Sequence, residues 1–460
     1  MTTDTLIYTI LAIAAAGLIL YAIQINTLMA TGPAEAERIA GAPLTVEQIE
    51  AVRDRLREQP INYERFLPPF KQRRYIVVGG SGILGGQIVL DLIAMGTPAA
   101  AIRIIDANPP IRDAEFSRLP AAAVSVLHAD VTSQAAVLSA FTATWPSSVS
   151  SIPITVFHTV ALIRPYERHD VLYHRCSKVN VGGTANVLRA AREVEAELFI
   201  YTSSCTAEHL PVDFFPRSSP LSLGPNYAQV LTAADFGKPL RRPGLFANNY
   251  ARSKAEAERL VKAAGEKGSM RTGVIRPGNA IYGHPEDKVL GRMLALGSLP
   301  SFGANWSQSW VGARNASLAH LQFEDALLGH HAEKLLGKAF LITDNGPPLR
   351  LSDVHKILNT ASRTGLRVIY PPPLLMLLVA YVIEAWSLAA ARLPGLHQLI
   401  GEPQDPLILF QPAVFSAAVS AVVDDSEARK PPEDGGIGYR PACTSLEGMT
   451  AQAMAHETAT

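Results

Sequence analysis

The sequence predicts an α/β protein with a doubly wound parallel sheet, a smaller C-terminal substrate-binding part and an N-terminal transmembrane helix. Short β-branched runs alternate with longer helical patterns from Tyr75 onward, which is typical of a parallel sheet with helices on both faces. A glycine-rich turn directly follows the first of these runs, and an uncharged apolar stretch lies near the N-terminus.

The apolar stretch runs from Thr5 to Ile25 and holds only apolar, small or neutral residues. About 20 such residues suffice to cross a bilayer as a helix. No basic residue precedes the stretch and no clear cleavage site follows it, which favours a retained anchor over a signal peptide. We therefore expect residues 1–30 to be a membrane anchor. Asp4 precedes it and Arg38 and Arg53 follow it, so the positive-inside rule places the body of the chain in the cytosol.

The residues after the anchor divide into a linker and a nucleotide-binding domain. Residues 31–70 are polar and interrupted by prolines, and one amphipathic helix is expected at Thr45–Glu58. Residues 71–282 hold the alternating pattern. The expected strands are Tyr75–Val78, Ala101–Ile105, Val124–His128, Thr155–His158, Leu198–Thr202 and Thr272–Ile275, and the expected helices are Gly85–Met95, Val179–Val194 and Tyr250–Ala264.

The first strand runs into glycines at 79, 82 and 85 and then into a helix. Glycines permit a tight turn and let a pyrophosphate approach the N–H groups at the helix start, so the pattern indicates a Rossmann-type dinucleotide site. Asp106 ends the next strand, where a carboxylate can accept both hydroxyls of a ribose; with no basic residue directly after it, NAD is favoured over NADP. Asp130, after the third strand, fits a contact with adenine and an ordinary strand-end cap equally well.

Tyr250 and Lys254 open a predicted helix, and residues four apart on a helix lie on one face. A nearby ammonium lowers the pKa of a tyrosine and allows it to act as a base. The preceding strand ends in Tyr-Thr-Ser-Ser204, whose last hydroxyl can hydrogen-bond the reacting oxygen. The three residues together predict a hydroxyl-oxidising site.

The chain resembles the extended short-chain dehydrogenase/reductase superfamily, and within it the branch of 3β-hydroxysteroid dehydrogenases and sterol-4α-carboxylate 3-dehydrogenases. The resemblance extends over about residues 75–441. Besides the glycine turn, Tyr250 and Lys254, it rests on His-Ala-Asp130, Val-Phe-His158-Thr-Val-Ala, Asn180-Val-Gly-Gly-Thr-Ala-Asn186, Tyr-Thr-Ser-Ser204, Ile-Arg-Pro277-Gly-Asn, Gly337-Lys-Ala-Phe-Leu-Ile-Thr-Asp344 and Ile437-Gly-Tyr-Arg-Pro441.

The resemblance implies NAD-dependent oxidation of a 3β-hydroxyl on a steroid or sterol, with Tyr250 as base, Lys254 as its activator and Ser204 orienting the oxygen. It further implies that Asn180 holds a water in a proton relay. If the substrate is a 4α-carboxysterol, decarboxylation follows. The implied cofactor contacts are Gly79, Gly82, Ile83, Leu84, Gly85, Asp106, Asp130, Val131, Ala161, Tyr250, Lys254 and Pro277. A hydrophobic substrate and an endoplasmic reticulum membrane location accord with the anchor.

Residues 283–460 form the expected substrate-binding region. Within it, residues 374–391 are apolar except for Glu384, a charge that disfavours a simple membrane crossing. A helix on the membrane and a buried core helix remain equal alternatives. Glu402 to Thr460 is expected to be a loop-rich tail. Residues 209–247, between Ser204 and Tyr250, are an insertion expected to form a loop over the substrate.

Composition limits the other functions. The chain has 41 basic and 41 acidic residues, so nothing favours nucleic acid as a partner. No metal is expected, because the spacing of His320, His330, His331 and Glu333 fits no usual ligand pattern. A homodimer is compatible with the sequence. The alternatives left open are a dehydrogenase with isomerase activity, a sugar-nucleotide epimerase or dehydratase, and a non-catalytic NAD-sensing membrane protein.

Overall fold

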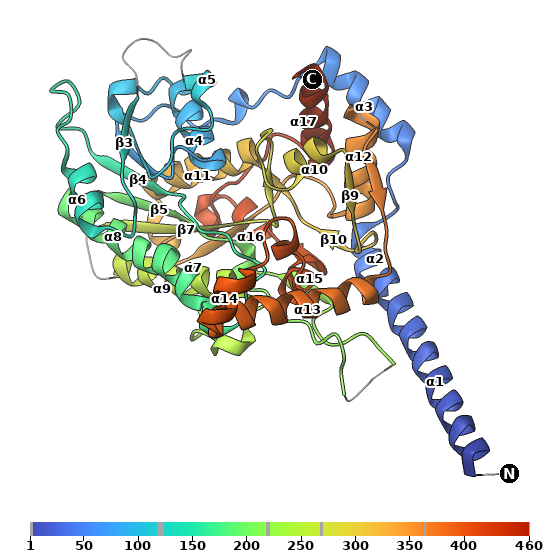
Figure 1. Cartoon of the computed structure of the whole chain (residues 1–460). Helices are drawn as coiled ribbons and strands as arrows, with labels where there is room; N and C mark the ends of the chain where they lie inside the picture. Colours follow the sequence, from blue (N-terminus) through green and yellow to red (C-terminus); the bar gives the residue numbers. More distant parts are fainter. Residues whose placement is uncertain (1–2, 117–123, 218–220, 267–269, 363–364, 460) are drawn as a thin grey trace.

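The computed structural model describes residues 3–116, 124–217, 221–266, 270–362 and 365–459. A body built around a twisted sheet carries one long helix, α1 (Thr3–Thr31), that projects away from it (Figure 1). Most of α1 is exposed, whereas Ile25 and Met29 near its end are buried against the body. The indole of Trp306 donates a hydrogen bond to Met29 O at 2.9 Å, so the end of the helix is attached to the folded part.

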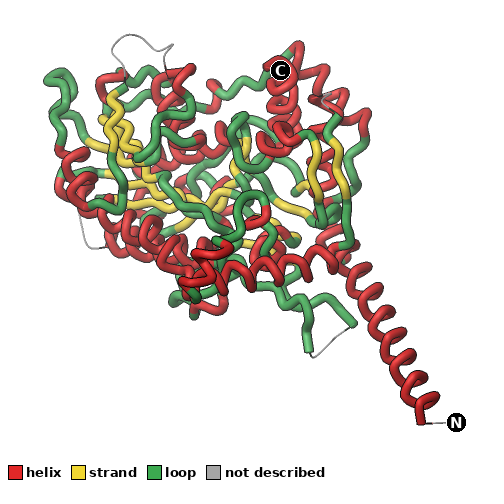
Figure 2. Tube along the Cα trace, viewed as in Figure 1, coloured by secondary structure: helices red, strands yellow, loops and turns green. Residues whose placement is uncertain are grey.

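The main sheet has seven parallel strands in the order β12-β7-β5-β4-β1-β2-β3. Figure 2 draws strands in yellow and helices in red. The six predicted strands are present within one to two residues at each end. These six are β1 (Arg74–Val78), β2 (Ile102–Asp106), β3 (Ser125–His128), β4 (Ile154–His158), β5 (Leu198–Thr202) and β7 (Arg271–Pro277). The seventh strand of the sheet, β12 (Ala339–Ile342), was not predicted. The predicted doubly wound α/β fold is therefore confirmed.

Helices cover both faces of this sheet because each strand presents apolar side chains on both sides. One face packs against α4 (Ile83–Ala94) and α11 (Ala313–Leu328) through a cluster that includes Ile88 and Phe323. The other face packs against α6 (Gln134–Thr142), α8 (Thr184–Glu193) and α9 (Asn249–Glu266) through a cluster that includes Val187 and Val261. A π-helical turn, Lys178–Gly183, precedes α8.

The C-terminal part is more ordered than the sequence predicted. A second sheet has the strand order β13-β10-β15-β6 and consists of β13 (Leu349–Arg350), β10 (Ser307–Gln308), β15 (Ser420–Val423) and β6 (Ala228–Leu231). The expected loop-rich tail is therefore wrong in part, because residues 402–460 also contain α15 (Pro412–Ala418), α16 (Ser426–Arg429) and α17 (Ser445–Ala459). The insertion 209–247 supplies β6, which pairs in parallel with β15.

The remaining elements surround these two sheets. In the linker, the helix predicted at Thr45–Glu58 is present as α3 (Val46–Glu58), and it begins at a Thr45 capping box. The other helices and strands are α2 (Ala34–Ala40), α5 (Asp113–Phe116), α7 (Tyr173–Ser177), α10 (Leu290–Leu296), α12 (Leu351–Ser362), β8 (Ile281–Tyr282), β9 (Ser298–Pro300), β11 (Val311–Gly312) and β14 (Arg367–Ile369).

The second apolar run forms α13 (Pro373–Arg392), which is followed directly by α14 (Pro394–Ile400). The Trp386 indole donates to Gly401 O at 2.9 Å, so α14 folds back on α13 and the two form one unit, the α13–α14 hairpin. Both α1 and α13 are long and apolar enough to cross a membrane. However, α13 buries one side against the body and exposes the other, where Val382 is 70% exposed.

Candidate active site

The predicted site residues meet at one edge of the main sheet. Because the strands are parallel, their carboxyl ends share this edge, and the residues that follow them lie side by side in the order of the strands. The chain leaves β1 and β4 in opposite directions, and ligands bind at such a switch point in doubly wound folds. From β3 to β7, this edge carries Asp130, Asp106, the Gly79–Gly85 turn, Ala161, Ser204 and Pro277.

The glycine turn is tight because its backbone segments touch. Gly79 has φ +91°, and a Cβ on Gly85 would lie 2.2 Å from Gly79 O, so neither position accepts a larger residue. A Cβ on Gly82 would meet no atom closer than 3.4 Å, which leaves space in front of the first turn of α4. The free N–H groups of that turn, including those of Ile83 and Leu84, therefore fit a pyrophosphate.

The two carboxylates at this edge differ in their surroundings. Asp106 accepts hydrogen bonds from Ser81 N at 3.2 Å and Asn108 N at 3.0 Å, and it lies beside the glycine turn, as a ribose contact requires. Asp130 is exposed and accepts from Thr132 N at 2.8 Å, which is the turn-capping role that the sequence left open. The contact of Asp130 with adenine stays a prediction.

Tyr250 and Ser204 lie together at the end of β5. Tyr250 is buried, and this burial raises the pKa of its phenol, while a hydrogen bond with Ser204 opposes the rise. Burial is thus the largest effect on this pKa and acts against the lowering that the sequence predicted, because desolvation disfavours a phenolate. The Ser204 hydroxyl also accepts from Thr206 N at 3.2 Å and Thr206 Oγ1 at 2.9 Å, which fixes its position.

Lys254 lies one helical turn from Tyr250 and is 1% exposed. Its ammonium donates to Thr202 O at 2.7 Å and lies 6.0 Å from the centroid of the Tyr250 ring. Burial lowers the pKa of Lys254 to about 7, and the carboxylate of Glu258, one turn farther along α9, opposes this shift. The charge of Lys254 is therefore sensitive to pH close to neutrality.

Asn180 lies in the π-helical turn and is buried. Its amide oxygen accepts from Leu162 N at 2.8 Å, and its amide nitrogen donates to Leu162 O at 3.0 Å and to Ser253 Oγ at 2.8 Å. Ser253 in turn donates to Tyr250 O at 2.8 Å. These bonds connect the loop after β4 to α9. The proton-relay role of Asn180 stays a prediction.

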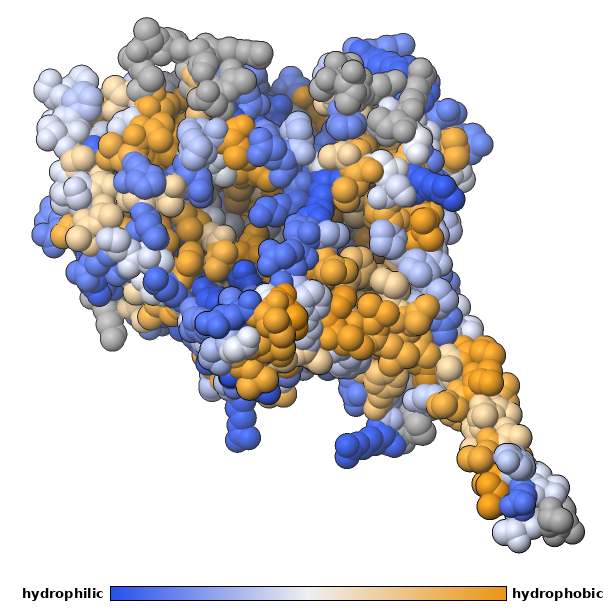
Figure 3. Space-filling model, in the orientation of Figure 1, coloured by the Kyte–Doolittle hydropathy of each residue, from blue (hydrophilic) through white to orange (hydrophobic). Residues whose placement is uncertain are grey.

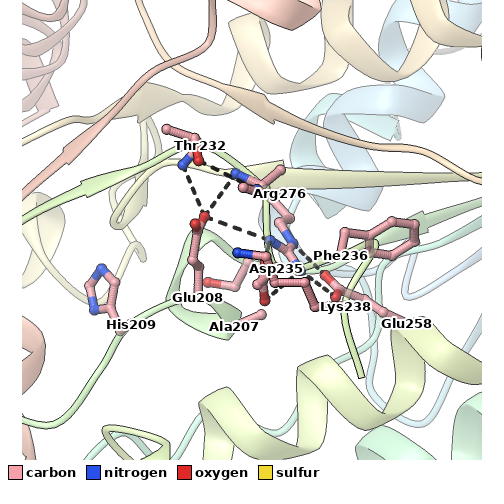
Figure 4. Close-up of polar contacts among 12 residues, drawn as sticks. Ala207, Glu208, His209, Thr232, Asp235, Phe236, Lys238, Glu258 and Arg276 are labelled. Atoms are coloured by element: carbon pink, nitrogen blue, oxygen red, sulfur yellow. Dashed lines mark hydrogen bonds and ion pairs between the residues drawn. The ribbon is translucent and has the colours of Figure 1, made fainter. Parts of the chain in front are cut away.

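Sequence reasoning treated Arg276 only as part of a motif, but it is the centre of a buried ionic cluster (Figure 4). Its guanidinium is fully buried and donates to both carboxylate oxygens of Glu258 at 2.7 Å, and to Asp235 at 2.5 Å. Glu258 belongs to α9, Arg276 to β7 and Asp235 to the insertion. The cluster therefore fixes α9 against the sheet edge. The spacing of these charged residues in the sequence did not indicate the contact.

Arg112 is a second residue that sequence reasoning missed. Its guanidinium donates to Ile83 O at 3.5 Å and pairs with Glu115, the shorter contact being 2.9 Å, so a buried cation lies beside the first turn of α4. The ion pair with Glu115 neutralises the charge of Arg112.

Among the described residues, no three His, Cys, Asp or Glu side chains gather as a metal site would require. His320 is buried and bonded to Thr202 Oγ1 at 2.7 Å.

Comparison with known proteins identifies the family. Residues 76–364 match the 3-beta hydroxysteroid dehydrogenase/isomerase family. The chain belongs to this family. A 3beta-hydroxysteroid-dehydrogenase/decarboxylase isoform 3 of Arabidopsis thaliana is 26% identical over 82% of this chain and 60% of its own length. A 3 beta-hydroxysteroid dehydrogenase/Delta 5-->4-isomerase of Mycobacterium tuberculosis is 29% identical over 60% of this chain and 62% of its own.

The matches with these family members thus span about three-fifths of the relatives' lengths. Among solved structures, an epimerase from Methanothermobacter thermautotrophicus has a TM-score of 0.55 at 15% identity, covering 87% of this chain and 95% of its own. A UDP-glucose 4-epimerase of Thermus thermophilus, solved with NAD, has a TM-score of 0.52 at 19% identity, covering 84% and 100%. At such low identity these structures confirm the fold of this family member and leave its substrate open.

Proposed function

We propose that this family member is a membrane-anchored enzyme that uses NAD to oxidise a 3β-hydroxyl group on a steroid or sterol. The observation that carries the proposal is the meeting of Ser204, Tyr250 and Lys254 at the carboxyl edge of the sheet, beside the open first turn of α4. Family membership supports the steroid or sterol class, since the Arabidopsis and Mycobacterium relatives carry names of that chemistry.

The residues divide the reaction among them. When bound, NAD supplies the acceptor for the hydride that leaves the carbinol carbon. Ser204 hydrogen-bonds the substrate oxygen, and Tyr250 takes the hydroxyl proton. Burial disfavours the Tyr250 phenolate, so the reaction needs cationic charge at the site, which Lys254 supplies while it is protonated. The N–H groups of the first turn of α4 and the Asp106 carboxylate would hold the dinucleotide.

The parts of the chain take separate roles in this proposal. Residues 71–282 bind NAD and carry the catalytic side chains, and residues 283–460 bind substrate. Residues 1–30 anchor the protein, and residues 31–70 link the anchor to the body. The exposed apolar sides of α1 and α13 continue into each other on one side of the molecule (Figure 3), which supports contact of both with a membrane. An endoplasmic reticulum location with the body in the cytosol fits this arrangement.

Purified protein in detergent, given NAD and separate 3β-hydroxysteroids, 4α-carboxysterols and UDP-sugars, tests the proposal. We expect NAD reduction, followed by absorbance, with at least one of the first two classes. A 4α-carboxysterol substrate would also release carbon dioxide, and isomerase activity would appear as a conjugated enone product. Conversion of a UDP-sugar into its epimer or its dehydrated product without net NAD reduction, with no steroid or sterol oxidised, would favour the sugar-nucleotide alternative. Turnover of none of the three classes would favour a non-catalytic NAD sensor.

A further inference from the structure

Glu384 is a carboxylate in the middle of the apolar helix α13, and its side chain is 8% exposed. Both of its oxygens accept hydrogen bonds from Arg168, from Nε at 2.7 Å and from Nη2 at 2.8 Å, and His169 Nε2 lies 3.3 Å away. A carboxylate so placed is costly unless it is paired. This bidentate ion pair attaches α13 to the Arg164–Arg175 segment, which follows β4 and leads to Asn180.

A second junction joins the same two parts of the chain. Glu402, directly after α14, accepts from Arg175 Nη1 at 2.9 Å and from Arg175 Nη2. Arg175 also donates to Glu167 at 3.0 Å, and Arg164 donates to the same carboxylate, through Nε at 2.8 Å. The α13–α14 hairpin is therefore attached near the middle and at the end of the Arg164–Arg175 segment.

This segment in turn holds the first residue of the catalytic helix. Asn249 is buried and donates through its backbone N–H to Glu167 O at 2.7 Å and through its side-chain amide to His169 O at 2.9 Å. The two accepting carbonyl groups flank Arg168, the partner of Glu384. A continuous path of direct bonds thus runs from the hairpin to Asn249, the neighbour of Tyr250.

We propose that Glu384 and Arg168 are positioning residues for the catalytic tyrosine, and that the α13–α14 hairpin sets the start of α9 through them. The inference rests on the proposed function, because it assigns Tyr250 as the base. Misplacement of a reacting group by about 1 Å can lower a rate about 10²-fold. Release of the hairpin is therefore expected to lower kcat while leaving the glycine turn and Asp106, which the proposed function assigns to NAD binding, intact.

The test compares Glu384→Gln with wild-type protein in two readouts. We expect kcat with a 3β-hydroxysteroid to fall about tenfold or more, with the Kd for NAD unchanged within about twofold. Hydrogen exchange of a peptide covering residues 248–254 should become faster by about tenfold, because the Asn249 amide loses its fixed acceptor. Exchange in β5, which has no bond to the segment, should remain at the wild-type rate.

Asp405→Asn is the matched control. Asp405 follows the same hairpin and pairs with Arg292 of α10, at 2.8 Å from Nη1, in an exposed contact that does not involve the Arg164–Arg175 segment. This variant should keep the kcat and the exchange rate of the wild-type protein. In a double variant, Arg168→Gln with Glu384→Gln, the loss of kcat should equal that of either single change, because both remove one shared contact.

A Glu384→Gln protein with wild-type kcat and wild-type exchange at residues 248–254 overturns the inference, even if its melting temperature falls, since that pattern describes a purely structural ion pair. Should this variant fail to fold, Arg168→Lys takes its place, because lysine keeps the positive charge but cannot form the bidentate ion pair. The same two readouts apply to it. Absence of turnover in the wild-type protein would defeat the proposed function instead, and the exchange measurement would still decide the inference.

Discussion

The two ends of the main sheet both bury titratable side chains, yet they serve different purposes. At the carboxyl end, Tyr250 and Lys254 have shifted pKa values and lie by the end of β5, where Lys254 donates to Thr202 O. At the amino end, Glu324 of α11 is fully buried and accepts from Thr155 Oγ1 at 2.5 Å and from Tyr75 OH at 3.3 Å. Burial raises the pKa of Glu324 to about 7. A shifted pKa alone therefore does not identify a site; its place on the sheet does.

The largest effect on kcat is expected from Tyr250, and Tyr75 at the opposite end of the sheet serves as its control. Tyr250→Phe should lower kcat with a 3β-hydroxysteroid by about 10³-fold, because the base is removed, with little change in melting temperature. Tyr75→Phe removes a buried hydroxyl of the same kind at the opposite end and should keep full activity. Equal activity of the two variants in steady-state assays would mean that the carboxyl end of the sheet is not the catalytic end.

Lys254→Met removes the positive charge beside Tyr250 and so tests whether the carboxyl end of the sheet depends on that charge for activity. Loss of the ammonium should lower kcat by about 10²-fold, because no other cation assists Tyr250 in the proposed mechanism. Burial lowers the pKa of Lys254 to about 7, so the ammonium is poorly solvated and its replacement by an apolar chain should not lower the free energy of unfolding. Denaturant unfolding alongside the kinetic assay measures both quantities. A large loss of stability with intact turnover would contradict the assigned role.

Asp106→Ala tests the proposed contribution of Asp106 to NAD binding. Loss of hydrogen bonds to a charged carboxylate should weaken NAD binding by about 10- to 100-fold, measured by fluorescence titration, with kcat at saturating NAD almost unchanged. Asp130→Ala is the companion variant, because Asp130 follows the neighbouring strand β3 and caps its own turn. An equal loss of affinity in both variants would confirm the adenine contact of Asp130; a loss in neither would remove both residues from the cofactor site.

The smallest effect on activity is expected at the amino end, where Glu324→Gln should change stability only. A carboxyl group whose folded pKa is raised contributes stability that is complete below its unfolded pKa of about 4.5 and is lost as pH rises through about 7. The wild-type free energy of unfolding should therefore fall relative to Glu324→Gln between these pH values, by roughly 3 kcal/mol at most. A constant difference across that range, in denaturant unfolding at several pH values, would contradict this pKa.

The contrast between the seven-stranded and the four-stranded sheet shows what local sequence patterns can and cannot reveal. The six predicted strands around the glycine turn were found because each is a short run rich in β-branched and apolar residues next to a helical pattern. The pair β6 and β15 was missed because each strand has four residues, and their partners are almost 200 positions apart in the chain. Short strands of this kind are defined by their pairing and not by their own sequence.

The sequence by itself determined the nucleotide-binding sheet, the glycine turn and the helical spacing of Tyr250 and Lys254, because these depend on residues that are neighbours in the chain. Only the tertiary structure decided that burial has the largest effect on the pKa of Tyr250 and that the hydrogen bond with Ser204 opposes it. It also decided that Glu384 faces Arg168, and that Arg276 joins α9 to β7. Desolvation and ion pairing depend on which distant segments pack together, and no local pattern records that.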